Sequence, residues 1–260
     1  MESQAVAAVA AVAAVDPTIV FIVPYRDRDL QRDFFRSHMA RVLSDMDPTT
    51  YEIYFSHQID NRVFNRGAMK NIGFIAMKEK YPSSYKNMTF VFNDVDTLPF
   101  VKNFLPFATT SGTIKHFYGF RFALGGIVSV NGGDFERING FPNFWSWGYE
   151  DNELQRRANL YKIAIDRSVF YPLFDRNIIF LQDGFFRTVN ETERKRYDWK
   201  TTEGITEITE LKYTIENDMI NATSFKTGTN ENRANAKIID LRSRIQATTT
   251  VRKKMGMMML

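Results

Sequence analysis

Short apolar runs alternate with amphipathic stretches over the first hundred residues of the chain. The runs at 18–23 and 88–92 are continuous and rich in β-branched and aromatic residues, which is typical of buried parallel strands. The run at 51–57 alternates and predicts a third strand. Between these runs, 29–46 and 66–80 repeat apolar residues at helical spacing. The order strand, helix, strand, helix, strand predicts a mainly parallel, Rossmann-type α/β sheet flanked by helices.

Each predicted helix carries a stripe of apolar side chains that we expect to face the core. In the 29–46 stretch, the stripe consists of Leu30, Phe34, Phe35, Met39, Val42 and Leu43, with charged residues opposite. In the 66–80 stretch it consists of Met69, Ile72, Ile75 and Ala76, and the helix is expected to end before Tyr81-Pro82.

The second half of the chain is less regular, and its elements are predicted to be shorter. They comprise a strand at 127–130, a short helix at 134–138, a helix at 150–161 and strands at 163–170 and 177–181. The 150–161 helix places Leu154, Ala158 and Tyr161 on one side. We expect the complete sheet to be mixed but mainly parallel.

The two ends of the chain differ from its middle in composition. Residues 1–17 are of low complexity, with an alanine and valine run and no basic region before it, so we expect a disordered leader and no membrane span. Residues 201–260 are rich in Thr, Glu and Asn and lose sharp periodicity, which predicts a C-terminal extension that is helical or partly disordered. Residues 18–200 are therefore expected to form the principal domain.

Composition excludes several classes of protein. The chain has 260 residues, of which 44% are hydrophobic, so it can bury a full core and is not generally disordered. It contains no cysteine, which excludes disulfides, thiol nucleophiles, cysteine zinc sites and iron–sulfur clusters. Its three histidines leave few candidates for a Ser-His-Asp triad or an all-histidine metal site. The net charge of +4 only weakly favours an anionic ligand.

The strongest local motif is Asn93-Asp94-Val95-Asp96, which directly follows the predicted strand at 88–92. Ligands of open α/β sheets bind at the carboxyl ends of strands, where Asp94 and Asp96 can face one pocket. Hard divalent cations prefer carboxylate oxygens, and a diphosphate can supply the rest of the shell. The motif suits departure of a nucleotide diphosphate beside a metal, and the alternative is a solvated acidic turn.

Two further motifs can contribute to an anion site. Arg26-Asp27-Arg28 follows the first predicted strand, and its arginines can contact phosphates; alternatively it is a surface ion-pair turn in which Asp27 or Asp29 caps the next helix. Phe64-Asn65-Arg66 stands at a predicted helix start, where the aromatic ring can stack on a base or ribose and the arginine can hold phosphate or sugar. The alternative there is a hydrophobic staple with an exposed arginine.

A loop rich in aromatic residues, 144–149, precedes the paired acids Glu150 and Asp151. Its two tryptophans, Trp145 and Trp147, suit a loop that stacks on sugar faces, and the helix dipole favours carboxylates at this position. An acid there can deprotonate an acceptor hydroxyl as a general base. The alternative is ordinary capping by Asp151 with both tryptophans in the core.

Together these motifs resemble the β-1,4-galactosyltransferase family, whose members are inverting, metal-dependent glycosyltransferases with the GT-A fold. The matching stretches are VPYRDR (23–28), FNRGAMKNIGF (64–74), FVFNDVDTLP (90–99), GGIVSVNGGDFERINGFPN (125–143) and WSWGYEDNEL (145–154). They occur in the family's order with similar spacing, and the resemblance covers roughly residues 18–200 as the catalytic domain.

The resemblance implies a role for each matching position. The UDP-sugar donor would be bound by Pro24, Tyr25, Arg26, Arg28, Phe64, Arg66, Asp94, Gly126 and Trp147. Mn²⁺, or another divalent cation, would be bound by Asp96 together with Asp94. Glu150 and Asp151 would bind the acceptor sugar, and Asp151 would be the base that takes the proton of the attacking hydroxyl. The reaction would invert configuration at the anomeric carbon in one displacement.

Two departures from the family pattern affect these expectations. The family completes its metal site with Met and His in an MxxH stretch, but residues 177–184 contain neither, so Asp183 or Gln182 is expected to replace them as an oxygen ligand. The family position beside the donor sugar that is usually Tyr falls near Ala123 or Leu124. A smaller residue there is expected to admit a larger sugar such as an N-acetylhexosamine.

The sequence thus predicts a transferase that moves galactose or an N-acetylhexosamine from a UDP-sugar to a glycan or glycoprotein hydroxyl. A non-catalytic module that binds nucleotide-sugar or glycan on the same fold is the alternative. Residues 233–254 carry seven basic residues and one acid, but charge runs are usually solvated, so we expect no nucleic-acid partner. The family's disulfide-bonded domains are secreted, whereas the absence of cysteine and of a membrane span here predicts a cytoplasmic enzyme of bacterial or viral origin.

Overall fold

The fold is described from a computed structural model, which covers residues 15–182, 184 and 186–240. The main sheet contains β1 (Ile19–Tyr25), β2 (Tyr51–Gln58), β3 (Thr89–Asn93), β5 (Thr113–Gly119), β6 (Ile127–Asn131), β7 (Ala164–Asp166), β8 (Tyr171–Pro172), β11 (Thr209–Glu216) and β12 (Met219–Lys226). Two small sheets pair β4 (Thr97–Pro99) with β9 (Ile178–Phe180) and β10 (Phe186–Asn190) with β13 (Ala236–Asp240). The helices are α1 (Asp29–Val42), α2 (Arg66–Lys80), α3 (Gly132–Arg137), α4 (Glu150–Leu160), α5 (Glu191–Asp198) and the 3₁₀ turn η1 (Ile205–Glu207).

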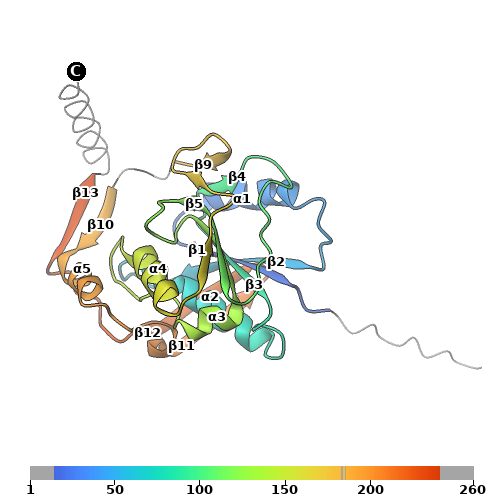
Figure 1. The fold of residues 1–260 in the computed structure, drawn as a ribbon. Coiled ribbons are helices and arrows are strands. Elements are labelled where there is room, and N and C mark those ends of the chain that lie inside the picture. Colours follow the sequence, from blue (N-terminus) through green and yellow to red (C-terminus); the bar gives the residue numbers. More distant parts are fainter. Residues whose placement is uncertain (1–14, 183, 185, 241–260) are drawn as a thin grey trace, which may run out of the picture.

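The main sheet is mixed, with the order β11-β12-β2-β1-β3-β6-β5-β7, and β8 also pairs with β5 (Figure 1). β12, β2, β1 and β3 are parallel neighbours, whereas β6 is antiparallel to both β3 and β5. The predicted strand–helix–strand–helix–strand order is confirmed, with α2 beginning and ending at the expected residues. The expected architecture, a mixed, mainly parallel sheet flanked by helices, is confirmed as well.

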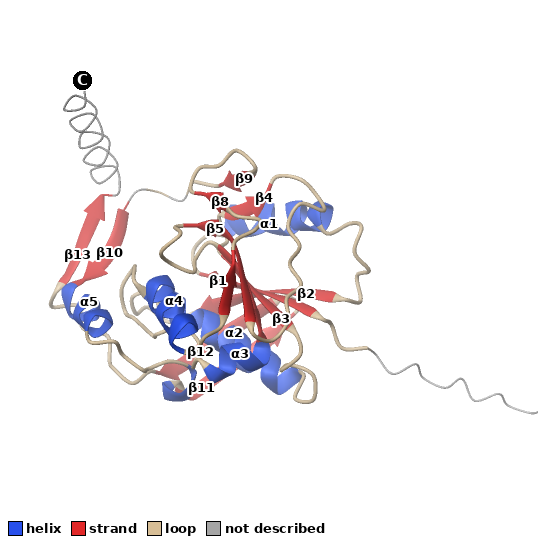
Figure 2. Ribbon diagram, in the orientation of Figure 1, coloured by secondary structure: helices blue, strands red, loops and turns tan. Residues whose placement is uncertain are grey.

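Helices cover both faces of the sheet, as Figure 2 shows. On one face, α2, α3 and α4 contribute side chains such as Met69, Phe135 and Leu154 to one buried cluster. On the other face, α1 packs Phe35 and Met39 against β1 and β2. No helix among the described residues is both long enough and apolar enough to cross a bilayer.

The apolar stripe predicted for the first helix is narrower than expected. Phe35, Met39 and Val42 are buried, but Leu30 is 83% and Phe34 39% exposed, so those two assignments are wrong. Both lie in the first half of α1 but on a different side of the helix from the buried Phe35. Phe34 instead stacks on His38, with 5.4 Å between ring centroids.

Several short elements of the second half also differ from prediction. α3 begins at Gly132, because the Asn131 side chain caps it by accepting from the amides of Gly133 and Asp134. The strand expected at 163–170 is limited to β7, and β9 pairs with β4 outside the main sheet. Tyr161, expected on the buried side of its helix, is 43% exposed.

The C-terminal region contains strands, contrary to the helical or disordered extension that we expected. β11 and β12 form an antiparallel hairpin, and β12 adds to the main sheet beside β2. Ile220, Ala222 and Phe225 of β12 are buried in the same cluster as α2. The prediction is therefore wrong for residues 209–226, which complete the sheet; residues 1–14 of the leader and residues 241–260 lie outside the described part of the chain.

Candidate active site

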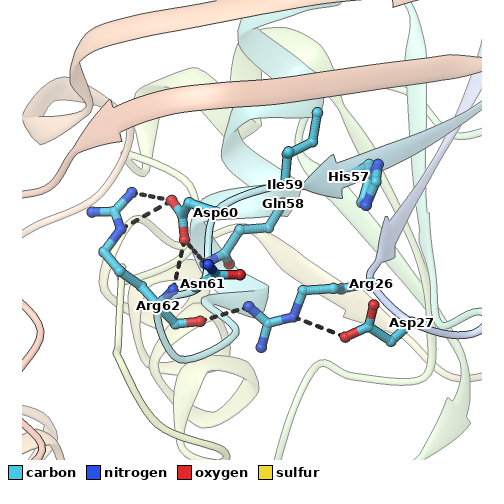
Figure 3. Close-up of a pocket in the computed structure, with 8 residues that line it drawn as sticks. All are labelled: Arg26, Asp27, His57, Gln58, Ile59, Asp60, Asn61 and Arg62. Carbon is cyan, nitrogen blue, oxygen red and sulfur yellow. Dashed lines mark hydrogen bonds and ion pairs between the residues drawn. The ribbon is translucent and has the colours of Figure 1, made fainter.

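A polar pocket lies at the carboxyl ends of β1 and β2 (Figure 3). It has a volume of about 260 Å³ and is lined by residues 26–27 and 57–62. Arg26 donates from Nη1 to the carbonyl of Arg62 at 2.6 Å, and its guanidinium lies 5.2 Å from the centroid of the Phe64 ring. The predicted donor residues Arg26 and Phe64 are therefore neighbours, and together they offer a cation and an aromatic face to one ligand.

The other residues predicted on the turn after β1 are engaged within the protein. Pro24 and Tyr25 are buried, and the Tyr25 hydroxyl donates to Asp29 at 2.6 Å. Burial and this carboxylate raise the pKa of Tyr25 to about 12. Arg28 holds the N-cap position of α1 and donates to the Asp27 carbonyl at 2.9 Å, with no side-chain capping bond. Capping by Asp27 or Asp29, the alternative considered for this turn, is not observed.

α2 begins at a second part of the site, and the side chain of its first residue, Arg66, lies in that part. Asn65 caps the helix by accepting from the Ala68 amide at 2.9 Å. Gly67 allows the helix to approach the following loop, because a Cβ atom at this position would overlap the Pro142 carbonyl. The Arg66 side chain is 16% exposed, which argues against the staple with an exposed arginine.

Arg66 binds three carboxylates from two other segments. Its Nη2 donates to the two oxygens of Asp94 at 2.6 and 2.7 Å. Its Nη1 donates to Glu150 at 2.6 Å and to both oxygens of Asp151 at 3.0 Å. Asp94 follows β3, whereas Glu150 and Asp151 form the first turn of α4. Four residues predicted from separate motifs thus meet, and the Asp94 side chain is not a solvated one.

Lys70 joins this cluster and was not predicted. Its side chain is 1% exposed, and Nζ donates to Asp151 Oδ1 at 3.2 Å. Nζ also lies 3.9 Å from Asp94 Oδ1 and 4.3 Å from the centroid of the Phe141 ring. The spacing from Arg66 could have revealed it, because residues four apart share one face of a helix.

Burial and charge act differently on the two acids of α4. Burial raises the pKa of Glu150, whose Oε2 is buried without a hydrogen-bond partner among the described residues. Burial also acts to raise the pKa of Asp151, but the charges of Arg66 and Lys70 outweigh it and lower that pKa. The lowered pKa favours the charged form of Asp151, which is the form that a general base requires.

Asp96 stands at the far end of the acidic turn and is partly buried. Its carbonyl accepts from the Leu181 amide at 2.7 Å, so the chain after β9 runs alongside it and brings Gln182 near. Asp183, the expected replacement ligand, lies outside the described residues. Within the part of the chain that is described, no group of three or more histidine or acidic side chains is arranged to hold a metal ion.

The glycine pair before β6 lies between the acidic turn and α4. The Gly126 carbonyl accepts from the Asp94 amide at 3.0 Å, and its φ of +72° is a conformation that favours glycine. Gly125 contacts the Asp151 carboxylate. Ala123 and Leu124, near the expected specificity position, are 5% and 0% exposed, and Leu124 belongs to the hydrophobic core.

His116 forms a hydrogen bond to Gly125 of this glycine pair. The sequence analysis did not assign His116 to the site. Its Nε2 donates to the carbonyls of Tyr118 and Gly125 at 3.0 and 3.1 Å, and its Nδ1 accepts from Arg167 at 3.0 Å. Burial, with the nearby Arg167 charge, lowers the pKa of His116 to about 4. A neutral imidazole with one tautomer fits this pattern of one donor and one acceptor.

The two tryptophans of the aromatic loop have different environments. Trp145 is buried and stacks on Phe225 with 5.7 Å between ring centroids, so it belongs to the core. Trp147 is 39% exposed, and its amide donates to the Thr188 carbonyl of β10 at 2.8 Å. The N-cap position of α4 is Tyr149, which makes no side-chain capping bond, so Asp151 does not cap the helix.

Two family models match this chain side by side. The N-terminal region of glycosyl transferase group 7 matches residues 11–105, and a galactosyltransferase domain model, described as the N-terminal domain of galactosyltransferase, matches residues 107–174. Together they cover more than half of the sequence. The chain belongs to the β-1,4-galactosyltransferase family. This confirms the resemblance carried by the FNR, DVD and WxWGxED motifs.

Named members of this family are about 30% identical to the chain over the residues that align. β-1,4-galactosyltransferase 4 of Cricetulus griseus is 30% identical over 161 residues, 57% of this chain and 44% of the relative. β-1,4-galactosyltransferase 2 of Homo sapiens is 27% identical over 221 residues, 80% of this chain and 54% of the relative. The chain thus spans about half the length of these relatives.

A solved structure confirms the fold. The catalytic domain of Drosophila β-1,4-galactosyltransferase 7 in complex with xylobiose matches with a TM-score of 0.59 and 20% identity, over 83% of this chain and 96% of that one. A mutant of the same protein, in complex with manganese, UDP-Gal and xylobiose, matches to the same extent. The chain therefore has the fold of a galactosyltransferase catalytic domain.

Proposed function

We propose that the protein is an inverting glycosyltransferase that moves a hexose from a UDP-sugar to a carbohydrate hydroxyl. The observation that carries this proposal is the convergence of Asp94, Glu150 and Asp151 on Arg66 at the carboxyl end of β3. Acids from the donor motif and the acceptor motif of the family thereby share one cation. A donor and an acceptor bound at their two motifs would meet at this point.

Asp151 is proposed to act as the general base. Its lowered pKa keeps it ionised, and its contact with Gly125 places it beside the glycine pair that the family resemblance assigns to the donor sugar. Asp151 would accept the proton of the acceptor hydroxyl while that oxygen attacks the anomeric carbon from the face opposite UDP. Glu150, whose Oε2 has no hydrogen-bond partner in the described part of the chain, would accept a hydrogen bond from a second acceptor hydroxyl.

The donor would bind across the two parts of the site. Arg26 and Phe64 would contact the nucleotide in the pocket beyond β1 and β2, with Pro24, Tyr25 and Arg28 forming the turn that supports it. Gly126 would lie close to the donor sugar, and Trp147, exposed on its loop, would cover donor and acceptor.

Mn²⁺ or another divalent cation is proposed as the cofactor, and the donor set near Asp96 fits a hard cation. Asp96 offers a carboxylate, and the backbone of the segment that carries Gln182 passes beside it, with Asp183 next in the sequence. Both oxygens of Asp94 already accept from Arg66, so Asp94 would hold the arginine and share the cation only in part. When bound, such a cation neutralises charge on the leaving diphosphate. A related structure that holds manganese and UDP-Gal supports this assignment.

The donor sugar is proposed to be galactose or an N-acetylhexosamine, and the acceptor a glycan or glycoprotein. The relatives are named galactosyltransferases, whereas the small Ala123 near the expected specificity position favours the larger sugar. Because the chain lacks cysteine, we also propose that it acts in the cytoplasm, which cell fractionation with an antibody to the protein would test.

The proposal is tested by measuring UDP release with Mn²⁺ and a panel of UDP- and GDP-sugars against simple sugar acceptors. We expect transfer from at least one UDP-sugar, and we expect D151N to abolish transfer while UDP-sugar binding stays within about threefold of wild type. We expect D96A to weaken Mn²⁺-dependent UDP binding. D45N, which changes an exposed acid paired with Lys102, is the matched control and should behave as wild type.

The same assay separates the enzyme from a non-catalytic binding module. Measurable UDP-sugar affinity without turnover of any donor would show a module of the same fold. Near-normal turnover of D151N would show that the base is a different residue.

A further inference from the structure

Lys70 is a buried cation in a place where an apolar residue would be expected. It lies in the middle of α2, and its neighbours Met69 and Ile72 are fully buried in the hydrophobic core. Burying an ammonium group without compensation is costly, so its retention needs a specific partner. The one hydrogen bond that Nζ makes among the described residues is to Asp151, at 3.2 Å.

The arrangement of charges shows what Lys70 adds. Arg66 divides its donors among Asp94, Glu150 and Asp151, and only its Nη1 reaches Asp151. With all groups ionised, three carboxylates face two cations, and without Lys70 they would face one. Lys70 makes its shorter ion pair with Asp151, at 3.2 Å against 3.9 Å to Asp94.

We propose that Lys70 is a positioning residue, which holds the carboxylate of Asp151 in place from the core side and keeps it charged for proton transfer. The proposal rests on the function proposed above, in which Asp151 is the base. Phe141 contributes by presenting its ring to the ammonium 4.3 Å away, which stabilises the cation on the side that faces the core. Lys70 is not expected to touch either substrate.

The test compares wild type with K70M and K70Q. Methionine fills a similar volume without charge, and glutamine keeps a hydrogen-bond donor without charge. We expect both variants to lower kcat by about tenfold to a hundredfold, while UDP affinity with Mn²⁺, measured by calorimetry, changes by less than threefold. K78M, in which an exposed lysine of the same helix is replaced, is the matched control and should keep wild-type kcat.

The pH profile of kcat/KM separates positioning from general damage to the fold. The charged groups facing Asp151 are Arg66 and Lys70 of α2, Glu150 of α4 and, more distantly, His116 of β5. Removing one of the two cations raises the pKa of the base, so we expect the acid limb to move up by about one pH unit in both variants. A purely structural role for Lys70 would leave this limb in place.

Each outcome has a distinct meaning. If wild type transfers no sugar, the proposed function fails, whatever Lys70 does. If wild type is active and K70M keeps kcat and its acid limb, or K70Q restores both, the positioning role of the Lys70 charge is overturned. A loss of UDP affinity equal to the loss of kcat would also overturn it, because the variant would then have disrupted the whole site.

Discussion

Gly125 lies directly against the side chain of Asp151, so closely that a Cβ atom at position 125 would overlap the carboxylate oxygen Oδ2. The adjoining peptide adds a second contact, because the Leu124 amide donates to the Asp151 carbonyl at 2.9 Å. The first turn of α4 is thereby fixed against the turn that precedes β6. The position of the proposed base thus depends on the absence of a side chain at residue 125.

We expect G125A to displace the Asp151 carboxylate and lower kcat by at least about tenfold, because small misplacements of a catalytic group are costly. UDP affinity should stay within about threefold, since the nucleotide pocket lies at other strand ends. Transfer kinetics and UDP calorimetry measure both effects. G133A in α3, remote from Asp151, is the control. Wild-type kcat in G125A would show that the carboxylate need not occupy its observed place.

We expect R66M to lower the free energy of unfolding by about 3–5 kcal/mol, because it removes the cation that pairs with all three carboxylates, including the buried Glu150. Urea unfolding at pH 7 measures the change. R194M removes an arginine whose ion pairs are exposed, and it should lower the free energy of unfolding far less than R66M does. Equal effects of the two substitutions would contradict a central structural role for Arg66.

The buried His116 predicts a loss of stability at mildly acidic pH. Its folded-state pKa of about 4 lies below the ordinary value of 6.5, so the unfolded chain binds the proton first. This stabilisation is complete above pH 6.5 and declines as the pH falls toward 4, by about 3 kcal/mol in total. Urea unfolding at pH 7 and pH 4.5 should show a smaller decline for H116Q than for wild type. Parallel declines would refute the assignment.

We expect F225A to destabilise the protein by about 3–5 kcal/mol, because Phe225 is 2% exposed and stacks on Trp145. I238A, in β13, removes a side chain that is 75% exposed and should change stability by less than about 0.5 kcal/mol. Thermal or urea unfolding compares the two variants. A negligible effect of F225A would mean that the C-terminal hairpin is not part of the core.

The sequence predicted those helices and strands that can be recognised from their own residues alone. β1, β3 and α2 were found because continuous apolar runs and a helical stripe need no distant partner to be recognised. β12 was missed, since its parallel partner β2 lies about 160 residues earlier and half of its own residues are polar. β11 was missed because it is an edge strand whose side chains are mainly exposed.

The candidate site was predicted in its acids and only partly in its cations. Asp94, Glu150 and Asp151 were proposed from two motifs, and the structure brings them together on Arg66 of a third. Lys70 was missed because it stands within an apolar stretch, where its charge looked incidental. The division of Trp145 and Trp147 between core and surface also depended on the hairpin at β12, which supplies Phe225.

The C-terminal hairpin and the segment after it also determine when, during synthesis, the pocket beside β2 can be completed. His57 contacts Asn221 at 3.1 Å, the Arg62 guanidinium donates to the Phe225 carbonyl at 3.0 Å, and the Val63 amide donates to Glu231 at 2.7 Å. A nascent chain that has left the ribosome only as far as residue 200 lacks all three contacts. The wall of the pocket beside β2 therefore gains these contacts only after translation has passed residue 231.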